Sequence, residues 1–183
     1  MTEQTDEELA GQVQSGNKAV FSQLITRYEE KLTRYARRFL SDSEDVRDVV
    51  QDIFIKTYVN IQAFDKDRRF SPWIYRIAHN ELVNVYKKRK RERLSYVDLE
   101  VVFPFLRAKE KTDMEVRDAE TKKLLEHGLE KINPKYREAL VLFYFEELSY
   151  QDIADILKIP IATVGVWIKR GKDALKKHLS PLV

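Results

Sequence analysis

The sequence predicts an all-α protein of two small helical domains joined by a linker, with a helix-turn-helix as the C-terminal domain. Apolar residues recur at three- and four-residue steps over most of the chain, as one buried face of a helix requires. That pattern breaks between residues 94 and 118 and then resumes. A strand is conceivable for 99–103, but no partner strand is visible elsewhere. We therefore expect domains at 1–93 and 119–183, with 94–118 as the linker.

The composition excludes several classes of site. The chain has 183 residues, of which 43% are hydrophobic and 34% charged, so two small domains with solvated surfaces can form. It has no cysteine, which rules out a disulfide scaffold, a thiolate metal site and a cysteine nucleophile. His79, His127 and His178 are far apart and share no ligand spacing. We predict no metal and no cofactor.

The sequence predicts neither a signal peptide nor a membrane span. No apolar run approaches the ~20 residues of a membrane span. The acidic start, with Glu3, Asp6, Glu7 and Glu8, does not resemble a signal peptide. We expect a soluble, cytoplasmic protein without membrane insertion.

Charge is distributed unevenly along the chain, although the net charge is only +3. Residues 61–95 carry 10 basic and 4 acidic side chains, and residues 131–183 carry 9 and 6. The segment between them carries 6 basic and 9 acidic side chains. Two basic blocks separated by an acidic one indicate two places where a polyanion could dock, although scattered surface charge explains the totals equally well.

Three helices are predicted in the first domain. Two apolar stripes cover residues 21–39 and 46–61, and the segment Ser41–Ser43 between them offers short polar side chains that cap helix starts. A third helix is expected from Ser71–Pro72, because serine can cap and proline at the first helical position loses no hydrogen bond. Its apolar face runs from Trp73 to Tyr86 and continues into the basic run Lys87–Arg91.

The linker contains an apolar cluster between Val101 and Leu106, interrupted by Pro104. Such a cluster can pack between the two domains, be captured by an inhibitory partner, or enter a larger complex. We favour packing between the domains, since the chain must stay soluble before it meets a partner.

The C-terminal domain carries clear helix-boundary signals. Asn133–Pro134 predicts a cap followed by a first-turn proline, and Ser149 and Asp152 have capping-box spacing. A short turn, Lys158–Pro160, then precedes the last helix, in which Gly171 indicates close packing.

A short capped helix, a turn and a second helix with basic residues form a helix-turn-helix, whose second helix fits the major groove of DNA. Val164, Ile168 and Leu175 would hold that helix against the core. The more outward positions are Gly165, Val166, Lys169, Arg170 and Lys172. Similar helix pairs also occur in proteins that do not bind DNA, so shape alone favours DNA binding without deciding it.

A second candidate nucleic-acid surface precedes the basic run. Phe64 and Phe70 flank the charged segment Asp65–Arg69, and Trp73 and Tyr75 follow on the helix. Aromatic rings beside cations can stack on unpaired bases while the cations hold phosphates. Alternatively, these rings close the domain core, and for Trp73 we favour that reading.

Two separate motifs resemble extracytoplasmic-function (ECF) sigma factors. The stretches Asp48–Phe54 and Phe70–Asn80 are similar to their second conserved region. The stretches Leu148–Ala154 and Ile159–Val164 are similar to their fourth region. The resemblance extends from about Lys18 to Leu175, with both motifs in the family's order.

The resemblance implies a role for each surface. Asp48, Gln51 and Asp52 would dock on the clamp helices of the largest subunit of core RNA polymerase. The loop Gln62–Phe70 and the following helix would melt promoter DNA and read its minus-ten element, and the last helix would read the minus-thirty-five element. The DNA contacts so implied in the first domain are Arg68, Arg69, Tyr75, Arg76, Asn80, Lys87, Lys88, Arg89, Lys90 and Arg91. Those in the second domain are Thr163, Gly165, Val166, Lys169, Arg170 and Lys172. An anti-sigma protein is a further possible partner.

The sequence departs from the family pattern at three places. Lys158 stands where the turn usually carries glycine, so a lysine must adopt a conformation that glycine adopts more easily. Gly165 and Val166 replace polar side chains that usually read bases, and Trp167 follows where relatives often have arginine.

Three other classes of function compete with the sigma factor. A helix-turn-helix regulator acting without polymerase would explain residues 134–178, but would leave the acidic helix and the aromatic loop without a role. An enzyme finds no support, because the five glycines are dispersed and form no phosphate loop. A purely structural helical adaptor remains a further alternative.

Overall fold

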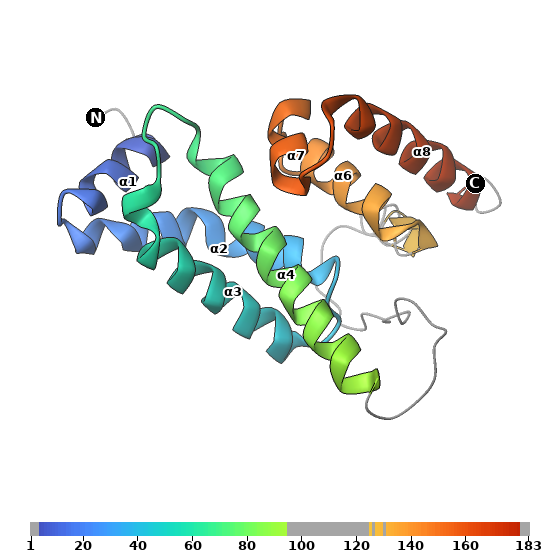
Figure 1. Ribbon diagram of the computed structural model, residues 1–183, viewed down its shortest axis with the longest axis horizontal. Helices are drawn as coiled ribbons and strands as arrows, with labels where there is room; N and C mark the ends of the chain where they lie inside the picture. The colour runs from blue at the N-terminus through green and yellow to red at the C-terminus, as the bar shows by residue number, and fades with distance from the viewer. Residues whose placement is uncertain (1–3, 95–124, 126, 130, 180–183) are drawn as a thin grey trace, which may run out of the picture. The chain divides into compact units, whose positions relative to one another are not determined.

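The computed structural model describes residues 4–94, 125, 127–129 and 131–179, with the side chains of residues 89–94 outside that description. The chain divides into two compact units, Met1–Pro104 and Phe105–Val183 (Figure 1). Every regular element in the described ranges is a helix, which confirms the all-α prediction. The apolar cluster Val101–Leu106 and nearly all of the predicted linker lie outside the described residues.

The described residues of the first unit form four α-helices and two short 3-10 turns. They are α1 (Asp6–Gln14), η1 (Lys18–Val20), α2 (Phe21–Arg37), α3 (Ser43–Val59), η2 (Ile61–Ala63) and α4 (Phe70–Leu94). Helices α2, α3 and α4 pack on one another, as the three apolar stripes predicted, and α1 adds contacts to α2, η2 and α4. Tyr86 differs from the prediction: it is 39% exposed, because α4 continues beyond the partners that cover its earlier turns.

The starts of these helices are fixed by side-chain caps. Asp42 caps α3 by accepting a hydrogen bond from the backbone N–H of Glu44, as the polar segment before that helix predicted. Helix α4 begins at Phe70 rather than at Pro72. Its first N–H donates to Oε1 of Glu7 at 2.8 Å, so the cap comes from α1 instead of Ser71. Pro72 still fits, because the N–H groups of a first helical turn have no partner within the helix.

The second unit is built on α6 (Pro134–Tyr144), α7 (Tyr150–Leu157) and α8 (Ile161–Leu179), preceded by helical residues at 125, 127–129 and 131. Asn133 caps α6, and Ser149 and Asp152 form the predicted capping box of α7. Lys158 ends α7 at φ 55° and ψ 47°. The left-handed conformation expected of this lysine is confirmed.

Gly171 allows α8 to pack closely against α6. A Cβ added there would lie 2.8 Å from Cδ1 of Leu140, whereas one added at Gly165 would meet Tyr150 Cε2 at an ordinary 3.4 Å. Leu140 is buried, and its Cγ would also lie only 3.0 Å from a Cβ at Gly171, so turning the end of the side chain alone does not relieve the contact. The sequence expectation of close packing at Gly171 therefore holds.

We expect Gly171→Ala to lower the free energy of unfolding of the second unit by about 1–3 kcal/mol, the usual range for overpacking a core. Gly165→Ala is the matched control on the same helix. It should leave stability unchanged or raise it by up to ~1 kcal/mol through helix propensity. Urea denaturation followed by helical circular dichroism measures both, and equal stabilities for the two variants would contradict the close packing.

Candidate polymerase and nucleic-acid surfaces

Asp48, Gln51 and Asp52 are all exposed on α3. Asp48 and Asp52 are four residues apart, so they share one face of the helix. That face continues into two apolar side chains, because Ile55 is 51% exposed and Val59 is 70% exposed. The surface that combines acidic and apolar groups, residues 48, 51, 52, 55 and 59, is called the α3 face below. Two exposed apolar side chains beside exposed carboxylates make this face a candidate for protein docking.

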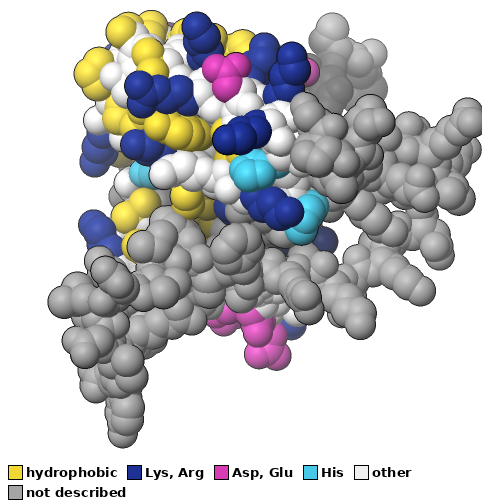
Figure 2. Space-filling view, turned by 90° about the vertical axis from the view of Figure 1, so that its right-hand side faces the viewer, with side chains coloured by type: hydrophobic (Ala, Val, Ile, Leu, Met, Phe, Trp, Pro, Cys, Tyr) yellow, Lys and Arg dark blue, Asp and Glu magenta, His cyan; other side chains and the backbone are white. Residues whose placement is uncertain are grey.

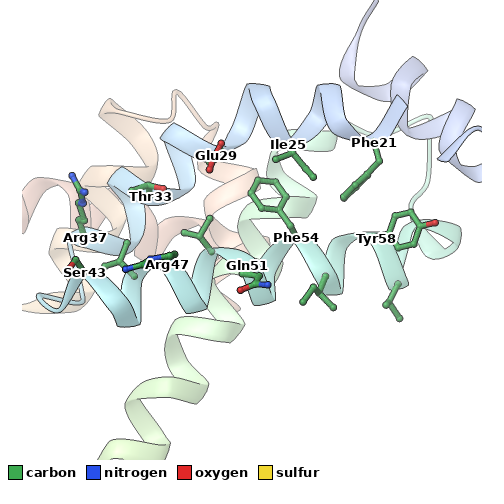
Figure 3. Close-up of a pocket in the computed structure, with 14 residues that line it drawn as sticks. Phe21, Ile25, Glu29, Thr33, Arg37, Ser43, Arg47, Gln51, Phe54 and Tyr58 are labelled. Atoms are coloured by element: carbon green, nitrogen blue, oxygen red, sulfur yellow. The ribbon is translucent and has the colours of Figure 1, made fainter. Parts of the chain in front are cut away.

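A groove of about 790 Å³ lies beside the α3 face, between α2 and α3 (Figure 3). Ile25 and Phe21 from α2 face Phe54 and Tyr58 from α3 across it, and Gln51 lies on its α3 wall. Phe21 and Tyr58 are in edge-to-face contact, with ring centroids 5.1 Å apart. The groove is therefore largely apolar, and it joins the α3 face through Gln51, Ile55 and Val59.

The segment Asp65–Arg69, called the reading loop below, stands on an aromatic cluster. Its five residues are exposed, while Phe64 and Phe70 on either side are buried, with their ring centroids 5.3 Å apart. Trp73 packs on both rings at 5.2 and 5.6 Å. Its ring thus belongs to this cluster, although it is only partly buried.

The reading loop is ordered by its first residue. Oδ1 of Asp65 accepts a hydrogen bond from the N–H of Asp67, and its carbonyl accepts one from Arg68. Its other carboxylate oxygen lies 3.5 Å from Nε of Arg68. Arg68 and Arg69 are thereby presented to solvent from a closed turn.

One face of α4 extends from this loop along the helix. Arg76, Asn80 and Lys87 are exposed and, with Trp73, recur at steps of three, four and seven residues. Lys88 is exposed beside them, whereas the side chains of Arg89, Lys90 and Arg91 lie outside the described residues.

Tyr75 does not join that face. It is 1% exposed, and its ring packs edge-to-face on Tyr35 at 5.4 Å. The expectation that Tyr75 contacts DNA does not fit this position, because the residue points into the core between α2 and α4.

Helices α7 and α8 form the predicted helix-turn-helix. Val164 and Ile168 are buried on the inner side of α8, while Val166 is 46% exposed and Lys169 is exposed on the outer side. Thr163 and Gly165 are partly exposed beside Val166. The outer side of α8 thus combines a short apolar segment with cations.

Tyrosine side chains of α6 lie near the other two cations of α8. Nη1 of Arg170 lies 3.4 Å from the hydroxyl of Tyr136, and Nζ of Lys172 lies 6.0 Å from the ring centroid of Tyr144. The hydrogen bond from Arg170 lowers the pKa of Tyr136. On the side where α8 lies, Figure 2 shows lysine and arginine side chains among hydrophobic ones, with few acidic groups between them. This surface suits a polyanion.

The part of the chain that the structure describes contains no cluster of side chains able to hold a metal ion. Among the same residues, no helix is both long and apolar enough to cross a bilayer.

Comparison with known proteins connects these surfaces to one family. Residues 24–92 match the family described as Sigma-70 region 2, and residues 122–175 match Sigma-70, region 4. The ECF RNA polymerase sigma factor SigW of Bacillus subtilis is 34% identical over 93% of this chain and 95% of its own length. This chain is an ECF sigma factor.

Two further relatives agree with this assignment. The ECF RNA polymerase sigma-E factor of Escherichia coli strain K12 is 32% identical over the whole of this chain and 99% of its own length. The solved structure of CnrH in complex with the cytosolic domain of CnrY is similar with a TM-score of 0.71 and 29% identity, over 97% of this chain and 99% of CnrH. As a sigma factor, the protein directs promoter-specific transcription by RNA polymerase.

Sequence reasoning missed two features of these surfaces. Ile55 and Val59 extend the acidic face by steps of three and four residues from Asp52, a spacing that could have revealed them. The hydrogen bonds of α1 to residues that flank the reading loop join positions 47 to 63 residues apart, and no local pattern indicates them.

Proposed function

We propose that this sigma factor divides initiation among three surfaces. The α3 face docks on core RNA polymerase, the reading loop with the exposed face of α4 holds the melted minus-ten element, and α8 reads the minus-thirty-five element. The observation that carries this proposal is the continuous exposed strip from the reading loop to Lys88, built on the aromatic cluster. A duplex-binding regulator would need only α7 and α8.

Each group in the strip suits single-stranded DNA. Asn80 offers both a donor and an acceptor to a base edge. Arg68, Arg69 and Arg76 can hold phosphates, and the part of Trp73 that remains exposed offers a ring for stacking. Lys87 and Lys88 begin the basic run, and Arg89, Lys90 and Arg91 complete the proposed phosphate contacts.

The outer side of α8 suits the major groove, with base contacts and phosphate contacts assigned to different residues. Val166 cannot donate a hydrogen bond but can contact the methyl group of thymine. Thr163 and Gly165 lie beside it, and Lys169, Arg170 and Lys172 supply phosphate contacts. Recognition of the minus-thirty-five element therefore depends on shape and apolar contact more than on a set of polar side chains.

The remaining assignments follow from this role. The protein works as a binding factor without a cofactor and carries out no covalent chemistry of its own. It acts in the cytoplasm, where bacterial core RNA polymerase and promoter DNA are found. CnrH forms a complex with the cytosolic domain of another protein, and by analogy the apolar groove beside the α3 face suits a helix of an anti-sigma partner.

Replacing Lys169, Arg170 and Lys172 with glutamine tests the DNA-binding surface of α8. For every phosphate that is no longer neutralised, the negative slope of log K against log salt for promoter DNA should become less steep by about 0.9, because fewer counterions are released. The same replacement of Lys18, Lys31 and Arg34, which lie on η1 and α2, is the matched control and should leave the slope unchanged. Equal slopes for the wild type, the α8 variant and the control variant would show that the cations of α8 are ordinary solvated charges.

A further inference from the structure

The reading loop is held at both ends by α1, a helix outside both stretches of the chain that match the sigma families. We propose that Gln14 and Glu7 are positioning residues for minus-ten recognition: they set the shape of the reading loop without contacting DNA. This inference rests on the proposed role of the loop.

Gln14 fixes the N-terminal end of the loop. Its Nε2 donates hydrogen bonds to the carbonyls of Ile61 and Phe64, at 2.8 and 2.7 Å. Gln62 donates in return to the backbone carbonyl of Gln14 at 3.1 Å. Because the amide nitrogen carries two hydrogens, the single side chain of Gln14 satisfies both carbonyls at once.

Glu7 fixes the C-terminal end of the loop. Its carboxylate accepts the hydrogen bond of the Phe70 N–H, the first of α4. A carboxylate at a helix N-terminus is also favoured by the helix dipole. Gln14 and Glu7 thus hold the backbone on both sides of the five exposed residues, directly at the buried rings of Phe64 and Phe70.

Helix α1 is itself firmly attached to the core, so it can act as a support. The carboxylate of Asp6 accepts hydrogen bonds from the hydroxyl of Tyr28 and from Nη1 of Arg27, each at 2.6 Å. Burial, above all, raises the pKa of Tyr28, which keeps its hydroxyl protonated as a donor. Thr5 and Glu8 close the start of α1 with a capping box.

A loop with fixed ends loses less conformational entropy when it binds DNA. Asp65 closes the turn from within, and α1 holds it from outside, so Arg68 and Arg69 are presented in one arrangement. If the hydrogen bonds from α1 are lost, the loop should be less ordered whether it meets a correct or an incorrect base. The expected loss is therefore in discrimination between bases rather than in attachment to polymerase.

The experiment uses holoenzyme reconstituted with core RNA polymerase and the promoter that the wild-type factor selects from a library randomised at minus ten. We expect Gln14→Leu and Glu7→Ala each to reduce discrimination against single-base minus-ten substitutions by about tenfold, the effect of ~1.4 kcal/mol. Affinity for core polymerase should change less than about twofold. Glu7→Gln keeps an oxygen acceptor and should retain most of the discrimination. Gln12→Leu is the matched control on the same helix and should behave as wild type.

Hydrogen exchange provides a second measurement, which reports the contact between Glu7 and the Phe70 N–H directly even where a variant is destabilised. Hydrogen exchange at the Phe70 amide should accelerate by about tenfold in Glu7→Ala while amides of α2 keep their wild-type rates. Full discrimination in both Gln14→Leu and Glu7→Ala would overturn the positioning role, and so would a parallel loss of core affinity. A wild-type factor that shows no minus-ten preference at all would instead overturn the proposed function of the loop, and this inference with it.

Discussion

Reversing Asp48 and Asp52 to lysine should lower the affinity of this sigma factor for core RNA polymerase by about ten- to a hundredfold. An exposed ion pair contributes only ~0–1 kcal/mol, but a reversal also introduces repulsion of similar size, so two reversals together remove about 1–3 kcal/mol. Both side chains are exposed on α3 and lie outside the core, so the helical circular-dichroism signal should not change. Fluorescence anisotropy of the labelled factor with purified core enzyme measures the affinity.

Two controls separate this docking effect from a change in overall charge. Asp48→Asn with Asp52→Asn removes the attraction without adding repulsion and should give an intermediate affinity. Asp155→Lys with Asp173→Lys makes the same change in net charge on exposed positions of the second unit and should retain wild-type affinity in the absence of DNA. Unchanged affinity in the Asp48 and Asp52 reversal would show that the α3 face does not dock on polymerase.

Phe70→Ala should lower the free energy of unfolding of the first unit by about 3–5 kcal/mol, the usual range for removing a buried phenylalanine ring. Phe70 is fully buried, and its ring contacts those of Tyr28, Phe64 and Trp73 at centroid distances of 5.5, 5.3 and 5.6 Å. Truncation leaves a cavity at the base of the reading loop. Because that loop would lose its support, minus-ten binding should fall together with stability.

Urea denaturation followed by tryptophan fluorescence measures this stability. In a Trp167→Phe background the signal reports the first unit, since Trp73 is then the sole tryptophan. Tyr86→Ala is the matched control, because it removes an aromatic ring that is 39% exposed on the same helix. That variant should lose much less stability than Phe70→Ala. Similar losses in the two variants would mean that the aromatic cluster does not close the loop.

Much of the fold was predictable because its signals are local. Apolar spacing located α2, α3 and α4, and cap residues located the starts of α3, α6 and α7. Lys158 occupies the turn position where the family usually has glycine, and the sequence therefore predicted a left-handed conformation for it. The structure confirms this, since the turn requires that geometry whichever residue occupies the position. Gly171 indicated a close helix contact for a similarly local reason.

Helix α1 was missed although its start carries a capping box. Thr5 and Glu8 have the required spacing, but only Leu9, Ala10 and Val13 are buried in its nine residues, so the apolar stripe is short. Its function could not be inferred locally in any case, because Gln14 contacts residues 47 and 50 positions away. Tyr75 was misplaced for the opposite reason: it lies beside the proposed DNA contacts in the sequence, but the turn of the helix directs it into the core.

In vitro transcription with purified core RNA polymerase and a promoter library randomised at the minus-ten and minus-thirty-five positions tests the central claim most directly. We predict that core enzyme alone starts without selection. Added factor should give defined start sites downstream of one paired set of elements, and the Asp48 and Asp52 reversal should strongly reduce that selection at limiting factor concentration. A factor that binds duplex DNA but leaves the choice of start sites by polymerase unchanged would contradict the claim.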